Sequence, residues 1–255
     1  MDQKQNQLNK LSAIFLLAGF GKRISNTTKD PKCLLKINKE TLIDKNLNIL
    51  KRLNIKDITL VLGYKKELIK KQIKTHKKYF NFKFAYNYDY RKKGNSYSLF
   101  RGLKKSDGNS IIFDGDLIFS YEILKDFIKD NNKSSFLIGK TPITNIECAK
   151  ALADKSGFVK KTIDKRLIKK SELKKLKFVG EAVGIIQIKT DVKKKMIFIL
   201  KKFLNEKKNI KLNWEHFMNE FLTDNNINYK KTINSQWIEI DTKQDYDKAK
   251  SLFKK

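Results

Sequence analysis

Cysteine and proline are scarce in this chain, which has 2 of each among its 255 residues. Cys33 and Cys148 lie far apart in the sequence and lack the short spacing of metal-binding cysteines. This pattern argues against a disulfide framework and against a cysteine-based metal site. It fits a reducing compartment, and we expect a cytoplasmic protein.

Long apolar runs are also missing. The segment Met1–Lys10 is polar throughout, so we expect no secretory signal, and no later run approaches the roughly 20 apolar residues of a membrane-spanning helix. No proline-rich or glycine-rich linker divides the chain. We therefore predict one domain over residues 1–255, with a polar N-terminal extension at 1–10 and no membrane span.

Acidic residues are few relative to basic ones. Lysine and arginine number 57 against 27 aspartates and glutamates, which gives a formal net charge of +30. Such an excess is compatible with binding to nucleic acid or to an acidic membrane surface. The lysines are spread over nearly every segment, however, which favours a solvated lysine-rich surface over a specific nucleic-acid site. Anionic substrates would be attracted in either case.

The segment Ala13–Ile24 combines a short apolar run with glycines and cations. The run ends in Gly19-Phe-Gly-Lys-Arg23. Glycines let backbone amides approach an anion closely, and lysine and arginine side chains supply positive charge. The spacing fits neither a P-loop nor a dinucleotide fingerprint, because Ile24 stands where each requires another glycine. We interpret the segment as a strand that leads into a polyphosphate-binding loop.

Apolar spacing alternates between strand-like and helix-like along the chain. Short apolar runs at 58–62 and 110–113 indicate strands, whereas 41–53 and 191–204 have the apolar period of a helix. This order predicts an α/β fold in which helical crossovers join parallel strands. Ligands of such sheets bind at the carboxyl ends of the strands.

Candidate ligand-binding side chains follow several of the predicted strands. The segment Asp114-Gly-Asp116 follows the strand at 110–113, and its two carboxylates suit a hard divalent cation, although an Asp-Gly turn without a metal is the alternative. Asn95 and Ser96 either cap the helix that follows them or reach the base of a nucleotide. Strand alternation places Glu239 and Asp241 on one side of a short C-terminal strand.

Two further segments offer contacts to a second substrate. Glu181 lies in a predicted strand at 178–188 whose glycines fit the close approach of a ligand or a neighbouring backbone. Trp214 and Glu215 open a helix at 214–222. An indole face and a carboxylate together suit an ammonium group, and the alternative is that the tryptophan belongs to the core.

These motifs resemble those of the nucleotidyltransferases that join a nucleoside triphosphate to a small phosphorylated acceptor. The pattern LLAGFGKR…PKCLL is similar to the signature L-A-x-G-x-G-x-R…P-K-x-L. The segment Trp237–Tyr246 is similar to W-x-E-I-D-[ST]-x-x-D-[YL] of the bacterial phosphocholine cytidylyltransferase-like branch. Elements similar to G-E-x-x-G at 180–184 and L-x-W-[D/E] at 212–215 point to the same branch, although Ala182 stands where several relatives have an aromatic residue. The resemblance covers Ala13 to Phe253.

The resemblance implies a Rossmann-like three-layer α/β/α sandwich around a mixed, mainly parallel central sheet. It also implies a Mg²⁺-dependent cytidylyltransferase that joins CTP to phosphocholine or a related amino-alcohol phosphate or phosphonate, giving a CDP-linked product and pyrophosphate. Sugar-1-phosphate nucleotidyl transfer is the alternative within the superfamily, and a non-enzymatic protein that binds polyanions or nucleic acid is the alternative of another class. The implied partners are CTP and the small acceptor, with no specific nucleic acid, and a homodimer is left open.

Taken with the residues themselves, the resemblance assigns roles within the site. Arg23 would hold the leaving pyrophosphate, and Lys32 would hold the α-phosphate or the acceptor phosphate as the second catalytic cation. Asp116, Glu239 and Asp241 would bind the metal. The remaining assignments are nucleotide binding by Leu17, Ala18, Gly19, Gly21, Lys22, Asn95 and Ser96, and acceptor binding by Glu181, Trp214 and Glu215.

Overall fold

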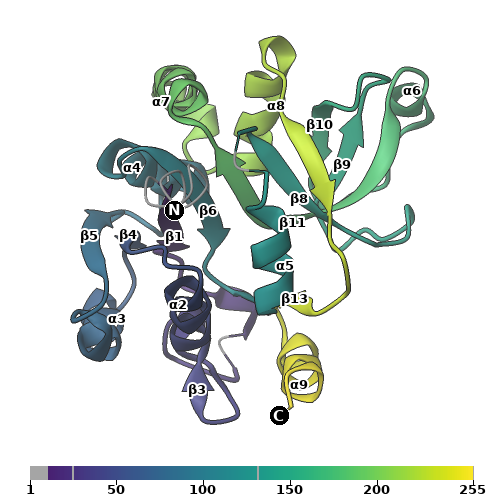
Figure 1. Cartoon of the computed structure of the whole chain (residues 1–255). Coiled ribbons are helices and arrows are strands. Elements are labelled where there is room, and N and C mark those ends of the chain that lie inside the picture. The colour runs from purple at the N-terminus through teal and green to yellow at the C-terminus, as the bar shows by residue number, and fades with distance from the viewer. Residues whose placement is uncertain (1–10, 25, 131, 255) are drawn as a thin grey trace, which may run out of the picture.

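A mixed sheet runs through the centre of the computed structural model, which describes residues 11–24, 26–130 and 132–254. Within these residues the sheet has nine strands, and its main path has the order β10-β9-β11-β6-β1-β4-β5 (Figure 1). Strand β8 lies along β11 and is itself paired with β12. The predicted N-terminal extension at 1–10 lies outside the described residues.

The N-terminal half of the chain builds the parallel part of the sheet. Its strands are β5 (Asn81–Tyr86), β4 (Asp57–Leu62), β1 (Leu11–Leu17) and β6 (Asn109–Asp114). Leu17 lies opposite Leu62, and Leu16 lies opposite Asp114, so that these strands end at one common edge. Loops that follow these strands therefore meet at that edge.

The long strand β11 (Lys177–Ile188) runs antiparallel to β6. Ile185 pairs with Phe113, so the residues of β11 before 184 extend beyond the carboxyl end of β6. This extended half pairs with β9, which in turn pairs with β10. The remaining strands of the sheet are β8 (Ser135–Gly139), β9 (Lys150–Ala153), β10 (Val159–Ile163) and β12 (Asn228–Lys231). These antiparallel strands therefore lie beside the carboxyl edge of the parallel strands and extend beyond it.

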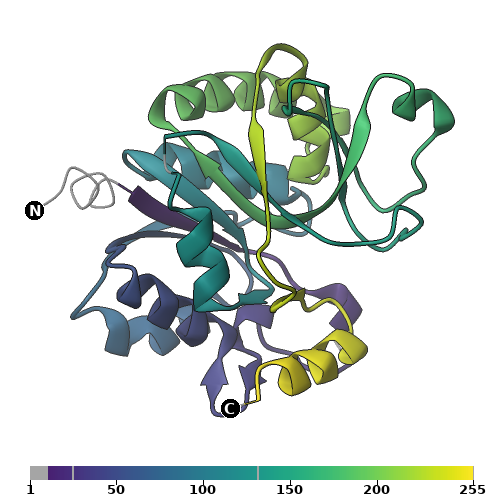
Figure 2. The same ribbon diagram turned by 45° about the vertical axis from the view of Figure 1, so that its right-hand side comes forward.

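Helices cover both faces of the sheet (Figures 1 and 2). Alternate residues of β1 point to opposite faces, with Phe15 and Leu17 in one core and Ile14 and Leu16 in the other. The first core includes side chains from α2 (Leu42–Arg52), α3 (Lys66–Gln72) and α5 (Tyr121–Phe127). The second includes side chains from α4 (Asn95–Lys105), α7 (Thr190–Asn205) and α8 (Trp214–Asp224). The predicted α/β/α class with a mixed central sheet is confirmed.

A third, smaller core joins the segment after β1 to the C-terminal segment. It contains Ile24 and Leu35 from the segment after β1, together with Ile238 and Ile240. Strand β13 (Trp237–Glu239) pairs with β7 (Leu117–Phe119), and the N–H of Ile240 donates to the carbonyl of Asp116 at 3.0 Å. This pairing brings the acidic C-terminal segment beside the turn that follows β6.

Short elements complete the described chain. Figure 2 shows the C-terminal helix α9 (Lys243–Leu252) close to the small hairpin of β2 and β3, and the Tyr246 hydroxyl donates to the carbonyl of Lys36. The other short elements are η1 (Lys22–Ile24), η2 (Lys32–Leu34), β2 (Lys36–Ile37), β3 (Glu40–Thr41), η3 (Ile73–His76), α6 (Lys170–Leu173) and η4 (Lys207–Asn209). None of the helices in the described ranges combines the length and apolar composition needed to cross a bilayer.

Lys193 of α7 is a buried lysine, with 5% of its surface exposed. Its ammonium donates to the carbonyl of Ser106 at 3.1 Å and lies 3.2 Å from the hydroxyl oxygens of Ser106 and Ser110. Burial lowers the pKa of this lysine to about 8, although Asp107 acts in the opposite direction.

We expect the Lys193 side chain to make the free energy of unfolding rise between pH 8 and pH 10.5. In this window the unfolded chain still holds a proton on the lysine that the folded chain has released, so a higher pH favours the folded state. The gain should reach at most about 3–4 kcal/mol, at roughly 1.4 kcal/mol per unit of pKa. Denaturant unfolding of wild type, Lys193→Met and the exposed control Lys194→Met measures it. Equal pH slopes in wild type and Lys193→Met would contradict the expectation.

Candidate active site

A cavity of about 380 Å³ lies at the carboxyl edge of the parallel strands. The loop after β1, the turn after β6 and the segment between β5 and α4 contribute one side of its lining. The extended half of β11 and the neighbouring antiparallel strands contribute the other side. The residues from that second side are Ala149, Asp164, Lys165, Ala182 and Gly184.

The loop after β1 contains the glycines of the predicted polyphosphate-binding loop. Leu17, Ala18, Gly19 and Gly21 all line the cavity. Gly21 has a φ of +68°, and a Cβ at this position would lie 2.9 Å from Cγ of Lys32. Glycine is favoured here both by the backbone conformation and by the close packing of the lysine stem. The side chain of Lys22, another predicted nucleotide contact, lies outside the described part of the structure.

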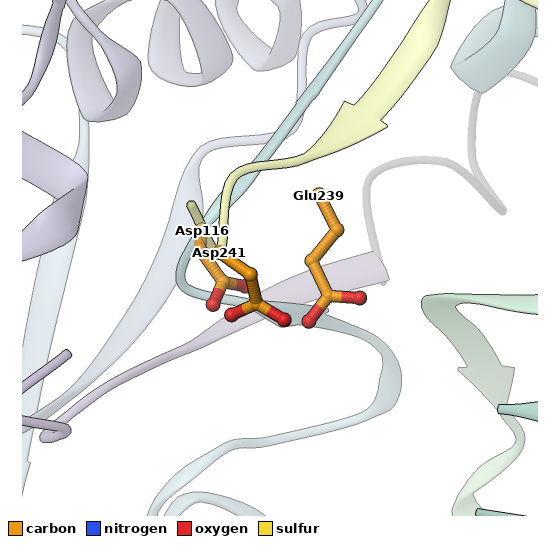
Figure 3. A group of neighbouring side chains, drawn as sticks. All are labelled: Asp116, Glu239 and Asp241. Carbon is orange, nitrogen blue, oxygen red and sulfur yellow. The ribbon is translucent and has the colours of Figure 1, made fainter. Parts of the chain in front are cut away.

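Asp116, Glu239 and Asp241 direct their carboxylates into one space (Figure 3). One carboxylate oxygen of each lies within 4.8 Å of the others. Burial, with the charges of Asp116 and Asp241, raises the pKa of Glu239 well above its usual range. Three carboxylates that repel one another at this spacing are stabilised by a shared cation, and the oxygen donor set fits a hard divalent ion.

The two predicted catalytic cations both contact these acids. Lys32 Nζ lies 2.9 Å from Oδ2 of Asp116 and 2.6 Å from Oδ1 of Asp241. Although burial acts in the opposite direction, the two carboxylates raise the pKa of Lys32 above its usual range. Arg23 Nη2 lies 2.6 Å from Oδ2 of Asp241. Burial alone would raise the pKa of Asp241, but the surrounding cations, Lys32 foremost, hold it at about 2.

Trp214 does not occupy its predicted place in an acceptor pocket. It is 2% exposed and packs in the second core, where its ring stacks near Phe136. Its indole Nε1 donates to the carboxylate of Asp114, at 3.2 Å from Oδ1. The structure therefore contradicts the prediction that Trp214 presents an indole face to an ammonium group. The alternative of a core tryptophan holds, and the side chain instead supports Asp114 from behind the cavity.

Gly184 packs against the same aspartate. It has a φ of +79°, and a Cβ there would lie 2.7 Å from Oδ2 of Asp114. At Gly184 the predicted close approach is thus made by an acidic side chain of the neighbouring strand, and at Gly180 it is made by the backbone of Gly139. Glu181, three residues before Gly184, is partly buried beside Cys148 and Thr141 and is not among the cavity-lining residues.

The two predicted contacts at the start of α4 differ in their placement. Asn95 lines the cavity, and its Oδ1 accepts from the N–H of Trp214 at 2.7 Å, which ties α4 to α8. Ser96 is 0% exposed, and its side chain is turned into the protein, so the prediction that it reaches the base is wrong. Ser98 lines the cavity instead.

Sequence reasoning missed several residues of the cavity wall. Asn87 follows β5, is 1% exposed, and donates its Nδ2 to the carbonyl of Lys93 and to the hydroxyl of Ser98. Its Oδ1 has no protein partner within the described part of the chain. An amide directly after a strand that ends at the ligand edge was the signal that could have identified it.

Lys165 is the most informative of the missed residues. Its Nζ lies 3.2 Å from Oδ2 of Asp241, whereas Lys32 contacts Oδ1 of the same carboxylate. Its φ is +42°, a left-handed conformation that costs a non-glycine residue roughly 1–3 kcal/mol and that concentrates at functional sites. In a chain so rich in lysine, nothing in the sequence distinguishes this one.

Comparison with known proteins identifies the family. The family profile described as nucleotidyl transferase matches residues 12–160, which is more than half of the chain. The chain belongs to the nucleotidyl transferase family. This confirms the resemblance seen in the glycine loop and the enzyme class that it implied.

Curated relatives of this nucleotidyltransferase include cytidylyltransferases. The choline-phosphate cytidylyltransferase of Streptococcus pneumoniae is 32% identical over 127 residues, which are 49% of this chain and 52% of that protein. The CTP:phosphoglutamine cytidylyltransferase of Campylobacter jejuni is 39% identical over 61 residues, 24% of each protein. A D-glycero-alpha-D-manno-heptose 1-phosphate guanylyltransferase of Campylobacter jejuni is 28% identical over 116 residues, 45% of this chain and 52% of that protein. This chain therefore aligns with about half, or less, of the length of these relatives.

Solved structures agree on the fold. The CTP:phosphocholine cytidylyltransferase of Streptococcus pneumoniae superposes with a TM-score of 0.75 at 21% identity, over 96% of this chain and 100% of that one. The inositol-1-phosphate CTP transferase of T. maritima gives a TM-score of 0.75 at 18% identity, over 95% and 94% of the two chains. At these identities the likeness establishes the fold.

Proposed function

We propose that this nucleotidyltransferase is a Mg²⁺-dependent cytidylyltransferase. Its substrates would be CTP and a small phosphorylated amino alcohol or a related phosphonate, and its products a CDP-linked compound and pyrophosphate. The observation that carries the proposal is the convergence of Asp116, Glu239 and Asp241 with Lys32 and Arg23 beside the glycine loop. The cytidylyltransferases among the relatives support CTP and an acceptor of this kind.

The reaction needs no covalent enzyme intermediate. An oxygen of the acceptor phosphate attacks the α-phosphorus of CTP, and the bond from that phosphorus to the bridging oxygen breaks, so that pyrophosphate leaves with the electron pair. An ionised phosphate is already nucleophilic, so the protein contributes by positioning and by neutralising charge. In this proposal the loop at Gly19 and Gly21 and the guanidinium of Arg23 bind the leaving pyrophosphate. Lys32 and Lys165 bind the α-phosphate and the acceptor phosphate.

Asp116, Glu239 and Asp241 would hold the Mg²⁺ ion. When bound, the ion neutralises negative charge on the phosphate oxygens. Lys32 contacts two of these carboxylates. Its side chain is long and flexible, so the ammonium group can turn toward a phosphate oxygen while the backbone stays in place.

The nucleotide base would lie against the segment between β5 and α4. Asn87, Tyr90 and Asn95 line this end of the cavity. The Oδ1 atom of Asn87 can accept a hydrogen bond, as from the exocyclic amino group of cytosine, which uracil and thymine lack. In this proposal Asn95 contacts the base, as expected from the sequence, and Ser98 contacts it in place of Ser96.

Pyrophosphate release tests the proposal. The assay combines CTP, UTP or dTTP with phosphocholine, phosphoethanolamine, 2-aminoethylphosphonate or glucose 1-phosphate. We expect turnover with CTP and an amino-alcohol acceptor, at least about tenfold faster than with UTP. Turnover confined to the hexose phosphate with UTP or dTTP would overturn the proposal in favour of sugar-1-phosphate nucleotidyl transfer, the activity class to which the heptose 1-phosphate guanylyltransferase belongs by its name.

A further inference from the structure

The end of the cavity at which we place the acceptor is lined by small residues and by charged ones. It lies between the extended half of β11, the segment after β10 and the first turn of α8. Three of its lining residues, Ala149, Ala182 and Gly184, have little or no side chain. The charged groups there are Asp164, Lys165 and Glu215.

Two carboxylates at this end lack a close cationic partner within the described residues. Glu215 Oε2 is buried and has no hydrogen-bond partner. Asp164 Oδ2 lies 3.8 Å from Nδ1 of His216, which is beyond hydrogen-bond distance. The ammonium of Lys165 is paired with Asp241 instead. Burial, together with the charge of Asp164, raises the pKa of Glu215 to about 7, although a backbone hydrogen bond and the charge of Lys165 act in the opposite direction.

Aromatic faces are missing from this end. Within the described part of the chain, Tyr90 is the aromatic residue that lines the cavity, and it belongs to the base end. Trp214 is covered by the core. Sites for quaternary ammonium groups use aromatic faces because a trimethylated nitrogen has no N–H to donate. A nitrogen that carries protons can instead donate directly to carboxylates.

We propose that the acceptor carries a primary ammonium group, which binds between Glu215 and Asp164, and that a trimethylammonium group is disfavoured. The inference rests on the proposed cytidylyl transfer and narrows its acceptor to aminoalkyl phosphates and phosphonates with a free amine. An –NH₃⁺ group offers three donors and one positive charge to two carboxylates, and charge-assisted bonds of this kind are about twice as strong as neutral ones. A neutral hydroxyl supplies a donor but no positive charge to these two carboxylates.

A series of acceptors with stepwise methylation tests the inference. Phosphoethanolamine, its N-methyl and N,N-dimethyl derivatives and phosphocholine are compared with CTP, together with the neutral ethylene glycol phosphate. We expect kcat/KM to fall by at least about tenfold from the primary amine to phosphocholine, and by a similar factor for the neutral compound. Equal or faster turnover of phosphocholine or of the neutral compound would overturn the inference and leave the cytidylyltransferase proposal standing. Absence of CTP turnover with every acceptor would overturn both.

Two isosteric variants test whether Glu215 and Asp164 bind the ammonium group. Glu215→Gln and Asp164→Asn each remove one charge and keep the shape of the side chain. We expect each to lower kcat/KM for phosphoethanolamine by at least about tenfold through a higher KM for the acceptor, with the KM for CTP within about twofold of wild type. The control is Glu220→Gln, an exposed position on the same helix, which should leave both constants unchanged. A parallel loss of affinity for CTP, or no change in the acceptor KM, would contradict binding of the ammonium group by these residues.

Discussion

Asp116→Asn is expected to lower kcat by at least about 10³-fold while the protein remains folded. The substitution keeps the shape of the side chain but removes a charge from the cluster with Glu239 and Asp241 and from the ion pair with Lys32. A metal ion contributes several kcal/mol of charge stabilisation, and each 1.36 kcal/mol corresponds to a tenfold change in rate. Pyrophosphate release measures the loss, and circular dichroism checks the fold.

The matched control for this variant is Asp130→Asn, an exposed aspartate away from the cavity. It should retain the wild-type rate. The same two variants distinguish an enzyme from the alternative of a polyanion-binding protein. A polyanion-binding protein would show no turnover even in wild type, and its salt-sensitive binding of nucleic acid would persist in Asp116→Asn. A kcat for Asp116→Asn within tenfold of wild type would show that this carboxylate does not support catalysis.

Lys32→Met should lower kcat/KM by at least about 10²-fold and should also destabilise the protein when no divalent ion is present. The substitution removes a cation that we propose binds a phosphate group during the reaction, which accounts for the expected kinetic effect. It also leaves the largely buried acids Asp116 and Asp241 without their bridging ammonium, and breaking a buried ion pair costs about 3–5 kcal/mol. Arg23 and Lys165 retain contact with Asp241 and reduce this cost.

Magnesium provides a second readout for Lys32→Met. In the proposed site the ion and Lys32 would use the same two carboxylates, so Mg²⁺ should raise the melting temperature of the variant by more than that of wild type. Thermal unfolding with and without Mg²⁺ measures the difference, with the exposed Lys36→Met as control. An identical Mg²⁺ shift in wild type and Lys32→Met would mean that the ion binds somewhere else.

Hydrophobic periodicity was sufficient to predict the fold class. The predicted strands at 58–62 and 110–113 correspond to β4 and β6, and the predicted helices at 41–53 and 191–204 correspond to α2 and α7. Each has a strong apolar pattern, because one face or both must be buried against the central sheet. The projection of β11 beyond the parallel strands was not predictable, since it depends on a pairing register that no local pattern reports.

The acidic cluster was predicted from the resemblance to the nucleotidyltransferases, because strand position and alternation indicate only that each acid lies at or near a strand end. Asp116 comes after β6, and Glu239 and Asp241 flank the buried Ile240. Trp214 was assigned wrongly because an apolar stripe at helical spacing does not reveal whether a residue at its end faces the core or a cavity. Lys165 was missed because its importance lies in a left-handed backbone and a distant partner.

A crystal structure with Mn²⁺ and a non-hydrolysable analogue of CTP tests the central claim most directly. That claim is that acids from separate segments hold one divalent ion at the triphosphate bound by the glycine loop. We expect one anomalous peak within about 2.5 Å of a carboxylate oxygen of Asp116 and of Asp241, with Arg23 directed at the triphosphate. A peak that contacts neither aspartate, or an ammonium of Lys32 still held between the two carboxylates with the nucleotide bound elsewhere, would contradict it.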